Sequence, residues 1–170
     1  MMRSEAKAIL RSLPMLAIGT RAPDFTLPDQ EGRTVTLLHL LCLGPLILYF
    51  YPADFTAGCT REACQIRDLY PQIEAAGLQV AGVSPQNPAS HRAFREKYHL
   101  PFTLLSDEER SVADLYGVRG PFGLGLRRAT FLIDSGAIIQ DALCADLRIA
   151  AHAQFVRSAV GRAGVPPRDS

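Results

Sequence analysis

Two cysteines five residues apart, Cys59 and Cys64, are the residues of this chain whose type and spacing most favour chemistry. Cys59 stands between Gly58 and Thr60 with the basic Arg61 close by, which is a poor environment for an inert buried thiol. The thiolate is the nucleophilic form of cysteine, and cationic neighbours and helix N-termini favour it. The pair therefore indicates redox chemistry centred on Cys59.

The flanking segments predict that Cys59 lies at the junction of a strand and a helix. Residues 46–51 form an apolar, aromatic run typical of a buried strand. Pro52 and Gly58 mark the turn that follows, and residues 59–76 are compatible with a helix. Cys59 is then expected in the first helical turn, where free backbone N–H groups and the helix dipole favour an anion.

The spacing of the two cysteines restricts how they can react with each other. In a regular helix the Cα atoms of residues i and i+5 are roughly 8 to 9 Å apart, whereas a disulfide requires about 7 Å or less. A Cys59–Cys64 disulfide therefore requires the first helical turns to unwind. The alternative, in which Cys64 is a buried hydrophobic residue without a redox role, stays open at this point.

Composition predicts one ordinary globular domain. The chain has 170 residues, of which 48% are hydrophobic and 21% charged, enough for a substantial core. The formal net charge of +1 gives no strong attraction to nucleic acid or to an anionic membrane, and no apolar run is long enough to span a bilayer. Charged residues and Pro14 interrupt any signal-peptide core near the N-terminus, so a cytoplasmic location is expected.

The remaining cysteines and the histidines predict neither a disulfide framework nor a metal site. In a reducing cytosol four cysteines do not form a disulfide scaffold, and Cys42 and Cys144, each within an apolar run, are expected to be small buried residues. No CxxC motif occurs, and the four histidines are scattered along the chain (His39, His91, His99 and His152).

The order of the expected elements indicates an α/β fold in which helices cover a central mixed sheet. A hairpin of strands precedes alternating strands and helices, and a second hairpin and a closing helix follow. The domain is expected over residues 19–160, with a leader at 1–18 and a flexible tail at 161–170. The expected strands are 22–28, 34–37, 46–51, 78–84, 103–105, 129–134 and 137–143, and the expected helices are 59–76, 88–98, 108–116 and 146–160.

The segment from Phe50 to Cys64 resembles the active-site segment of the peroxiredoxins, and more specifically of the bacterioferritin comigratory protein or PrxQ branch. The family pattern is proline, three residues, threonine, two residues and cysteine, which Pro52, Thr56 and Cys59 match. Cys64 matches the second cysteine of the branch. Further segments match in the same order over about residues 19–160, namely 22–27, 82–84, His91, 104–107, 116–118 and 128–134.

The resemblance implies a thioredoxin-like fold and thiol-dependent reduction of hydrogen peroxide or organic hydroperoxides without a metal or organic cofactor. By motif position, Cys59 is the peroxidatic nucleophile and Cys64 the resolving cysteine. Thr56 would hydrogen-bond the thiolate and the peroxide, Pro52 would shield the thiolate from water, and Arg128 would stabilise the thiolate and polarise the peroxide. The expected partner is thioredoxin or a similar dithiol reductant, and the expected state is a monomer, with a dimer as the alternative.

Several of these residues also have simpler structural interpretations. Strand alternation allows only one of Arg127 and Arg128 to face the site, and the family pattern favours Arg128. Thr56 can instead be a helix cap, and Glu62 can stabilise the helix N-terminus or pair with an arginine. His91 and His152 are expected to be surface or packing residues. Two departures from the branch are Ala57 in place of proline and Gln86 in place of aspartate.

The expected mechanism is oxidation of Cys59 to a sulfenic acid, unwinding of the helix, and formation of a Cys59–Cys64 disulfide that a dithiol protein reduces. One rival is a general thiol–disulfide oxidoreductase on the same fold, against which the missing CxxC motif argues. The other is a peroxide sensor or chaperone that uses the same oxidation as a signal.

Overall fold

The computed structural model describes residues 14–163, and its centre is a mixed five-stranded sheet with strand order β5-β4-β3-β6-β7. The middle strand, β3 (Leu46–Phe50), runs parallel to β4 (Gln79–Ser84) and antiparallel to β6 (Ala129–Ile133). The outer strands are β5 (Thr103–Ser106) and β7 (Ile139–Cys144). Every residue of β3 is buried, as expected for a strand covered on both faces.

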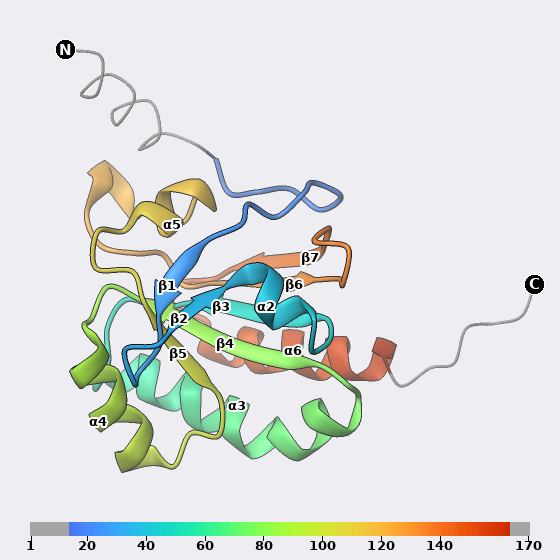
Figure 1. Cartoon of the computed structure of the whole chain (residues 1–170), viewed down its shortest axis with the longest axis horizontal. Helices are drawn as coiled ribbons and strands as arrows, with labels where there is room; N and C mark the ends of the chain where they lie inside the picture. The colour runs from blue at the N-terminus through green and yellow to red at the C-terminus, as the bar shows by residue number, and fades with distance from the viewer. Residues whose placement is uncertain (1–13, 164–170) are drawn as a thin grey trace, which may run out of the picture.

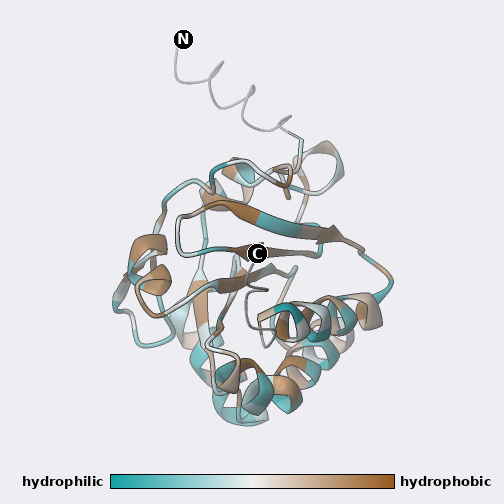
Figure 2. Ribbon diagram, turned by 90° about the vertical axis from the view of Figure 1, so that its right-hand side faces the viewer, coloured by the Kyte–Doolittle hydropathy of each residue, from teal (hydrophilic) through white to brown (hydrophobic). Residues whose placement is uncertain are grey.

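Helices cover one face of the sheet and a mixed layer covers the other (Figure 1). Side chains that alternate along β3 divide the core into two clusters. Ile47 and Tyr49 belong to the cluster that joins α3 (Ala57–Ala75), α4 (Pro88–Tyr98) and α6 (Ile149–Ala163). Figure 2 shows the strands between these helices and the opposite layer.

The opposite layer contains the N-terminal hairpin and two short helices. Leu48 and Phe50 of β3 pack in this cluster. The hairpin consists of two antiparallel strands of three residues each. The elements of this layer are β1 (Thr26–Pro28), β2 (Thr34–Thr36), α2 (Leu37–Leu41) and α5 (Ser111–Leu115). The 3₁₀ turn η1 (Pro121–Gly123) lies in the loop between α5 and β6 and has no buried residue. Within residues 14–163, no helix combines the length and the apolar character needed to cross a membrane.

The expected fold class is confirmed: the chain is α/β, with a central mixed sheet flanked by helices and an N-terminal β-hairpin. Helix α2 was not expected, because five residues are too short for a helical period to be recognised. The hydroxyl oxygen of Thr36 caps α2 by accepting the N–H of His39 at 3.1 Å.

The largest differences from the expected helix boundaries, of three residues each, are at the start of α5 and at both ends of α6. The helix expected at 108–116 begins only at Ser111, because Arg110 has a left-handed backbone with φ of 58°. Asp107 nevertheless accepts backbone N–H groups of this helix, including that of Ala113 at 2.8 Å. α6, expected at 146–160, begins at Ile149 and continues to Ala163, so residues 161–163 are helical rather than part of a loose tail. The expected leader and tail otherwise lie largely outside the described residues, which exclude 1–13 and 164–170.

The expectation that Cys42 and Cys144 are buried was wrong for Cys42 and only partly right for Cys144. Cys42 is exposed because it follows α2, whose inward positions are occupied by Leu37, Leu40 and Leu41. Cys144 is half-buried at the end of β7, where burial raises the pKa of its thiol.

Candidate active site

The Cys59 side chain is buried in the first turn of α3, immediately beyond the end of the central strand. Its exposed fraction is 1%. Thr56 is the N-cap in an extended conformation, and the first helical hydrogen bond joins the N–H of Thr60 to the carbonyl of Thr56 at 2.9 Å. The N–H group of Cys59 thus precedes the helical ladder and is free to stabilise an anion near the sulfur.

Arg128 is the cation that contacts the sulfur. Its Nη2 donates a hydrogen bond to Cys59 Sγ at 3.3 Å, and its side chain is buried. The neighbouring Arg127 points outward, is 44% exposed and pairs with Asp146 at 3.2 Å. The other carboxylate oxygen of Asp146 accepts the backbone N–H of Arg128 at 2.9 Å, so Asp146 fixes the backbone at the start of β6. Of the two arginines, Arg128 is therefore the one brought to the cysteine.

Gly58 allows this close approach. A Cβ atom at this position would lie 3.2 Å from Arg128 Nη2 and 2.9 Å from Cδ1 of Ile149 in α6. Any side chain there would displace the guanidinium or the helix. From the sequence Gly58 is only a turn signal, because the packing of Ile149 against the turn is not visible in the local sequence.

Glu62 lies one turn further along α3 and pairs with the other side of the same guanidinium. Its Oε2 accepts a hydrogen bond from Arg128 Nη1, and its side chain is 1% exposed. Burial raises the pKa of Glu62 to about 7, although Arg128 opposes the shift. Burial disfavours the charge of Arg128, but the nearby Glu62 and Cys59 favour it more strongly, so the pKa of Arg128 is raised. Of the two interpretations of Glu62, pairing with an arginine is the one the geometry supports.

His152 of α6 lies behind Glu62 and is fully buried, so of the two expected roles, surface or packing, it has the packing role. Its Nε2 lies 2.9 Å from the carbonyl of Ala145 and therefore carries the proton. Its Nδ1 accepts the hydroxyl of Thr130 at 2.8 Å and lies 3.7 Å from Glu62 Oε1. Burial, with a contribution from Arg128, lowers the pKa of His152, so the imidazole is neutral near pH 7.

The other expected site residues are Pro52 and Thr56 in the turn and Cys64 within α3, and none of them makes a side-chain hydrogen bond to Cys59 within residues 14–163. Thr56 is exposed, and its hydroxyl donates to the carbonyl of Ala53 at 2.9 Å, which leaves its lone pairs available to accept. Pro52 is half-buried directly after β3. Cys64 is half-buried in the intact helix, and both it and Cys59 are free thiols.

Comparison with known proteins identifies the family of this site. Residues 18–142 match the AhpC/TSA family. The chain belongs to this family. Its expected branch is confirmed as well, because the relatives and the solved structures it resembles are peroxiredoxins of the bacterioferritin comigratory protein and peroxiredoxin Q type.

Three similar proteins illustrate the match. A protein named as a peroxiredoxin bcp in Coxiella burnetii is 42% identical over 153 residues, covering 86% of this chain and 98% of its own. The crystal structure of peroxidoxin BcpB from Mycobacterium tuberculosis has a TM-score of 0.82 at 35% identity, covering 89% of this chain and 99% of its own. The bacterioferritin comigratory protein of Xanthomonas campestris has a TM-score of 0.75 at 30% identity, covering 82% and 92%.

Plant relatives extend the same branch. The chloroplastic peroxiredoxin Q of Arabidopsis thaliana is 48% identical over 123 residues, or 72% of this chain, and the match spans only 56% of that longer protein. Membership of the peroxiredoxins supports a thiol peroxidase function, an oxidoreductase activity that consumes peroxide with the help of a thiol reductant.

A second buried polar cluster in this peroxiredoxin holds the loop between Pro52 and Thr56. Asp54 Oδ2 lies 2.7 Å from His91 Nδ1, and Asp54 Oδ1 accepts the hydroxyl of Tyr51 at 2.6 Å. His91 Nε2 lies 3.1 Å from the carbonyl of Leu105, and the histidine is fully buried, so of the two expected roles it has the packing role. Gln86, which departs from the usual aspartate, accepts the N–H of Asp54 at 3.0 Å. The cluster thus ties the loop that carries the motif to α4 and β5.

We expect the substitution Asp54→Ala to destabilise the peroxiredoxin by about 3 kcal/mol, because removing this buried carboxyl group leaves the His91 ring and the Tyr51 hydroxyl without a hydrogen-bond partner away from water. The measurement is the free energy of unfolding from denaturant titration. The matched control is Glu31→Ala, which removes the exposed ion pair with Arg92 and should cost about 1 kcal/mol or less. Equal losses in the two variants would contradict the structural role of the Asp54–His91 pair.

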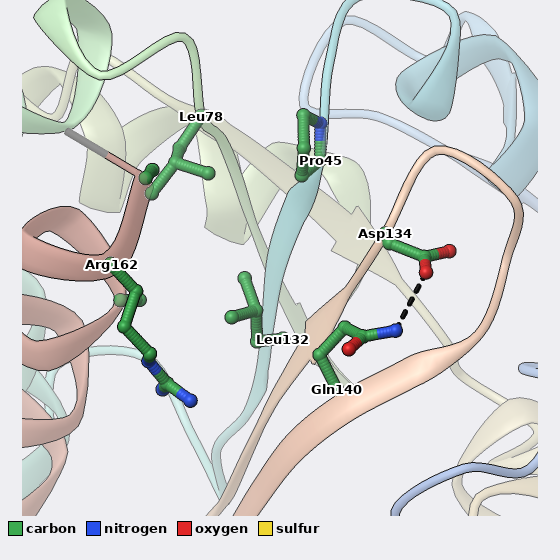
Figure 3. Close-up of a pocket in the computed structure, with 8 residues that line it drawn as sticks. Pro45, Leu78, Leu132, Asp134, Gln140 and Arg162 are labelled. Atoms are coloured by element: carbon green, nitrogen blue, oxygen red, sulfur yellow. Dashed lines mark hydrogen bonds between the residues drawn. The ribbon is translucent and has the colours of Figure 1, made fainter. Parts of the chain in front are cut away.

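The pocket shown in Figure 3 lies at the opposite end of the sheet from Cys59. Pro45 and Leu78, which line it, immediately precede β3 and β4, whereas Cys59 follows the far end of β3. Asp134 and Gln140 close one side through a 2.6 Å hydrogen bond. This pocket is therefore separate from the site. Among residues 14–163, no group of three or more His, Cys, Asp or Glu side chains is arranged to hold a metal ion.

Proposed function

We propose that this chain reduces hydrogen peroxide and organic hydroperoxides with Cys59 as the peroxidatic nucleophile. The single observation that carries the proposal is the placement of the Cys59 sulfur in the first turn of α3, 3.3 Å from Arg128 Nη2. A guanidinium and a helix N-terminus both favour a thiolate, which is the reactive form. The Xanthomonas campestris relative has alkyl peroxide reduction activity, which supports organic hydroperoxides as substrates here.

In the first step the Cys59 thiolate attacks one peroxide oxygen. An S–O bond forms as the O–O bond breaks, the sulfur is oxidised by two electrons, and the leaving oxygen takes up a proton to give water or an alcohol. Arg128 is placed to stabilise the charge that develops on the oxygens. The free lone pairs of the Thr56 hydroxyl can accept the peroxide O–H, and Pro52 would limit the access of water to the sulfur.

In the second step Cys64 is the proposed resolving cysteine. Its thiolate attacks Cys59 Sγ, an S–S bond forms, and the sulfenic oxygen leaves as water. Because both cysteines lie within the intact helix α3, and an i, i+5 pair in a helix is too far apart for a disulfide, the segment 59–64 must unwind first. The resulting enzyme is an atypical two-cysteine peroxidase whose disulfide forms within one chain.

Thioredoxin or a similar dithiol protein is the proposed reductant, by thiol–disulfide exchange with the Cys59–Cys64 disulfide. We place the activity in the cytoplasm, where a reducing pool keeps such thiols available, and expect the enzyme to act as a monomer. Size-exclusion chromatography with light scattering on the reduced protein tests the last point, and a stable dimer would contradict it.

The substitution Cys64→Ser should separate the two steps. A single turnover with peroxide is expected at close to the wild-type rate, whereas thioredoxin-linked turnover should fall by about 100-fold or more, because no resolving thiolate is adjacent to the sulfenic acid. Rapid-quench mass spectrometry measures the first rate and NADPH consumption in a coupled thioredoxin assay measures the second. Unchanged steady-state turnover would mean that Cys59 works alone or that Cys42 or Cys144 resolves it.

A further inference from the structure

Glu62 lies between the two cysteines on the segment that has to unwind. It is three residues after Cys59 and two before Cys64, and its side chain is 1% exposed. Unwinding the segment therefore removes this carboxyl group from the core and exposes it to water. The free energy of unwinding accordingly includes the difference between a buried and a hydrated Glu62 carboxyl.

Only one of the two carboxylate oxygens of Glu62 is satisfied in the folded segment. Oε2 is paired with Arg128, whereas Oε1 has no hydrogen-bond partner among the described residues. His152 Nδ1 lies 3.7 Å from Oε1, but this nitrogen is occupied as the acceptor of the Thr130 hydroxyl. The negative charge on Oε1 is thus uncompensated in a water-excluded site, which favours the protonated carboxyl.

The titratable and charged groups around Glu62 come from every element packed against it. Arg128 precedes β6, His152 belongs to α6, Tyr49 belongs to β3, and Cys59 lies on α3 itself. The hydroxyl of Tyr49 is buried without a partner among the described residues, and its pKa is raised well above the ordinary value, first by burial and then by Glu62. Arg128 is the single cation among these groups, and it is shared with the Cys59 sulfur.

We propose that Glu62 makes the unwinding of the Cys59–Cys64 segment depend on pH, with a protonated Glu62 holding the segment helical and an ionised Glu62 promoting its release. The proposal rests on the proposed function, since it concerns the step that brings Cys64 to Cys59. Its consequence is that the enzyme forms its disulfide readily near neutral pH and keeps the folded, peroxide-reactive form for longer in acid.

The direction follows from proton linkage. The pKa of Glu62 is about 7 in the folded segment and about 4.5 when the group is free in water. The stabilisation of the folded segment is therefore complete below about pH 4.5 and is lost as the pH rises from about 4.5 through about 7. Over this window we expect the unwound fraction to rise by about tenfold or more, since each unit of pKa shift corresponds to a tenfold change in the equilibrium.

The test compares wild type with Glu62→Gln, which keeps the shape of the protonated carboxyl but cannot ionise. The rate of disulfide formation after a single addition of hydrogen peroxide is measured by rapid-quench mass spectrometry from about pH 5 to about pH 7.5. Any effect of pH on the attacking thiol itself is common to both proteins and cancels in the ratio of their rates. The ratio of wild type to variant should rise about tenfold or more with pH. The matched control Glu74→Gln, an exposed position on the same helix, should follow wild type.

A second measurement uses the reduced wild type alone, so its result does not depend on whether the Glu62→Gln variant folds correctly. Hydrogen–deuterium exchange of the peptide containing residues 59–64, corrected for the intrinsic pH dependence, should show about tenfold less protection at about pH 7.5 than at about pH 5. A constant rate ratio together with constant protection would overturn the role of Glu62. If wild type forms sulfenic acid but no disulfide at any pH, the proposed resolving step fails instead, and the exchange measurement still decides whether Glu62 controls unwinding.

Discussion

Replacing Cys59 with serine is expected to abolish peroxide reduction. The rate of peroxide consumption should fall by on the order of 10³-fold or more, because a serine hydroxyl at a helix N-terminus does not ionise near neutral pH. No second thiol among the described residues is hydrogen-bonded to Arg128. Stopped-flow or electrode measurement of peroxide consumption gives the rate. Cys59 is 1% exposed, and serine is slightly smaller, so the fold should be retained.

The matched control for this variant is Cys42→Ser. Cys42 is an exposed cysteine that follows α2, and its replacement should leave the rate unchanged. Peroxide consumption that persists in Cys59→Ser but disappears in Cys42→Ser would assign the reaction to a different thiol and contradict the proposed site.

The substitution Arg128→Met is expected to reduce the rate of Cys59 oxidation by about 10²- to 10³-fold. Removal of one donor aimed at developing charge in a buried site typically has this effect, and Arg128 contacts the sulfur at 3.3 Å, where the peroxide oxygens would react. Single-turnover kinetics give the rate, and the ultraviolet absorbance of the thiolate against pH reports whether the anion itself has become less stable. A loss of rate with an unchanged thiolate titration would assign Arg128 to the transition state alone.

Arg127→Met is the matched control, since it removes the same side chain one position away. Arg127 is 44% exposed and contacts Asp146 rather than the cysteine, so its loss should change the rate less than about twofold. Equal losses in the two variants would contradict the assignment of Arg128, and thermal unfolding of both variants would show whether a structural defect is responsible.

The position of Cys59 could be predicted because every signal for it is local. An apolar run predicts β3, Pro52 and Gly58 predict the turn, and the first helical residues follow at once. The choice between Arg127 and Arg128 needed more than local pattern, because alternation allows either arginine to face inward. The family resemblance favoured Arg128, and the structure shows what separates the pair: Asp146 binds Arg127 on the outside and fixes the backbone of Arg128.

The buried polar contacts could not be predicted, because they join residues that are distant in sequence. The Glu62–Arg128 pair spans 66 positions and the Asp54–His91 pair spans 37. A histidine within an amphipathic helix has the same sequence pattern whether it faces solvent or a carboxylate on another element. The exposure of Cys42 could not be predicted either, because it depends on the short helix α2, which the sequence pattern did not indicate.

The measurement that tests the central claim most directly is the intact mass and peptide map of the fully reduced protein after a single equivalent of hydrogen peroxide, run beside Cys64→Ser. We predict that wild type loses two hydrogens and that the map joins Cys59 to Cys64, whereas the variant gains one oxygen on Cys59. An unchanged mass, or a disulfide that leaves out Cys59, would contradict the proposed mechanism.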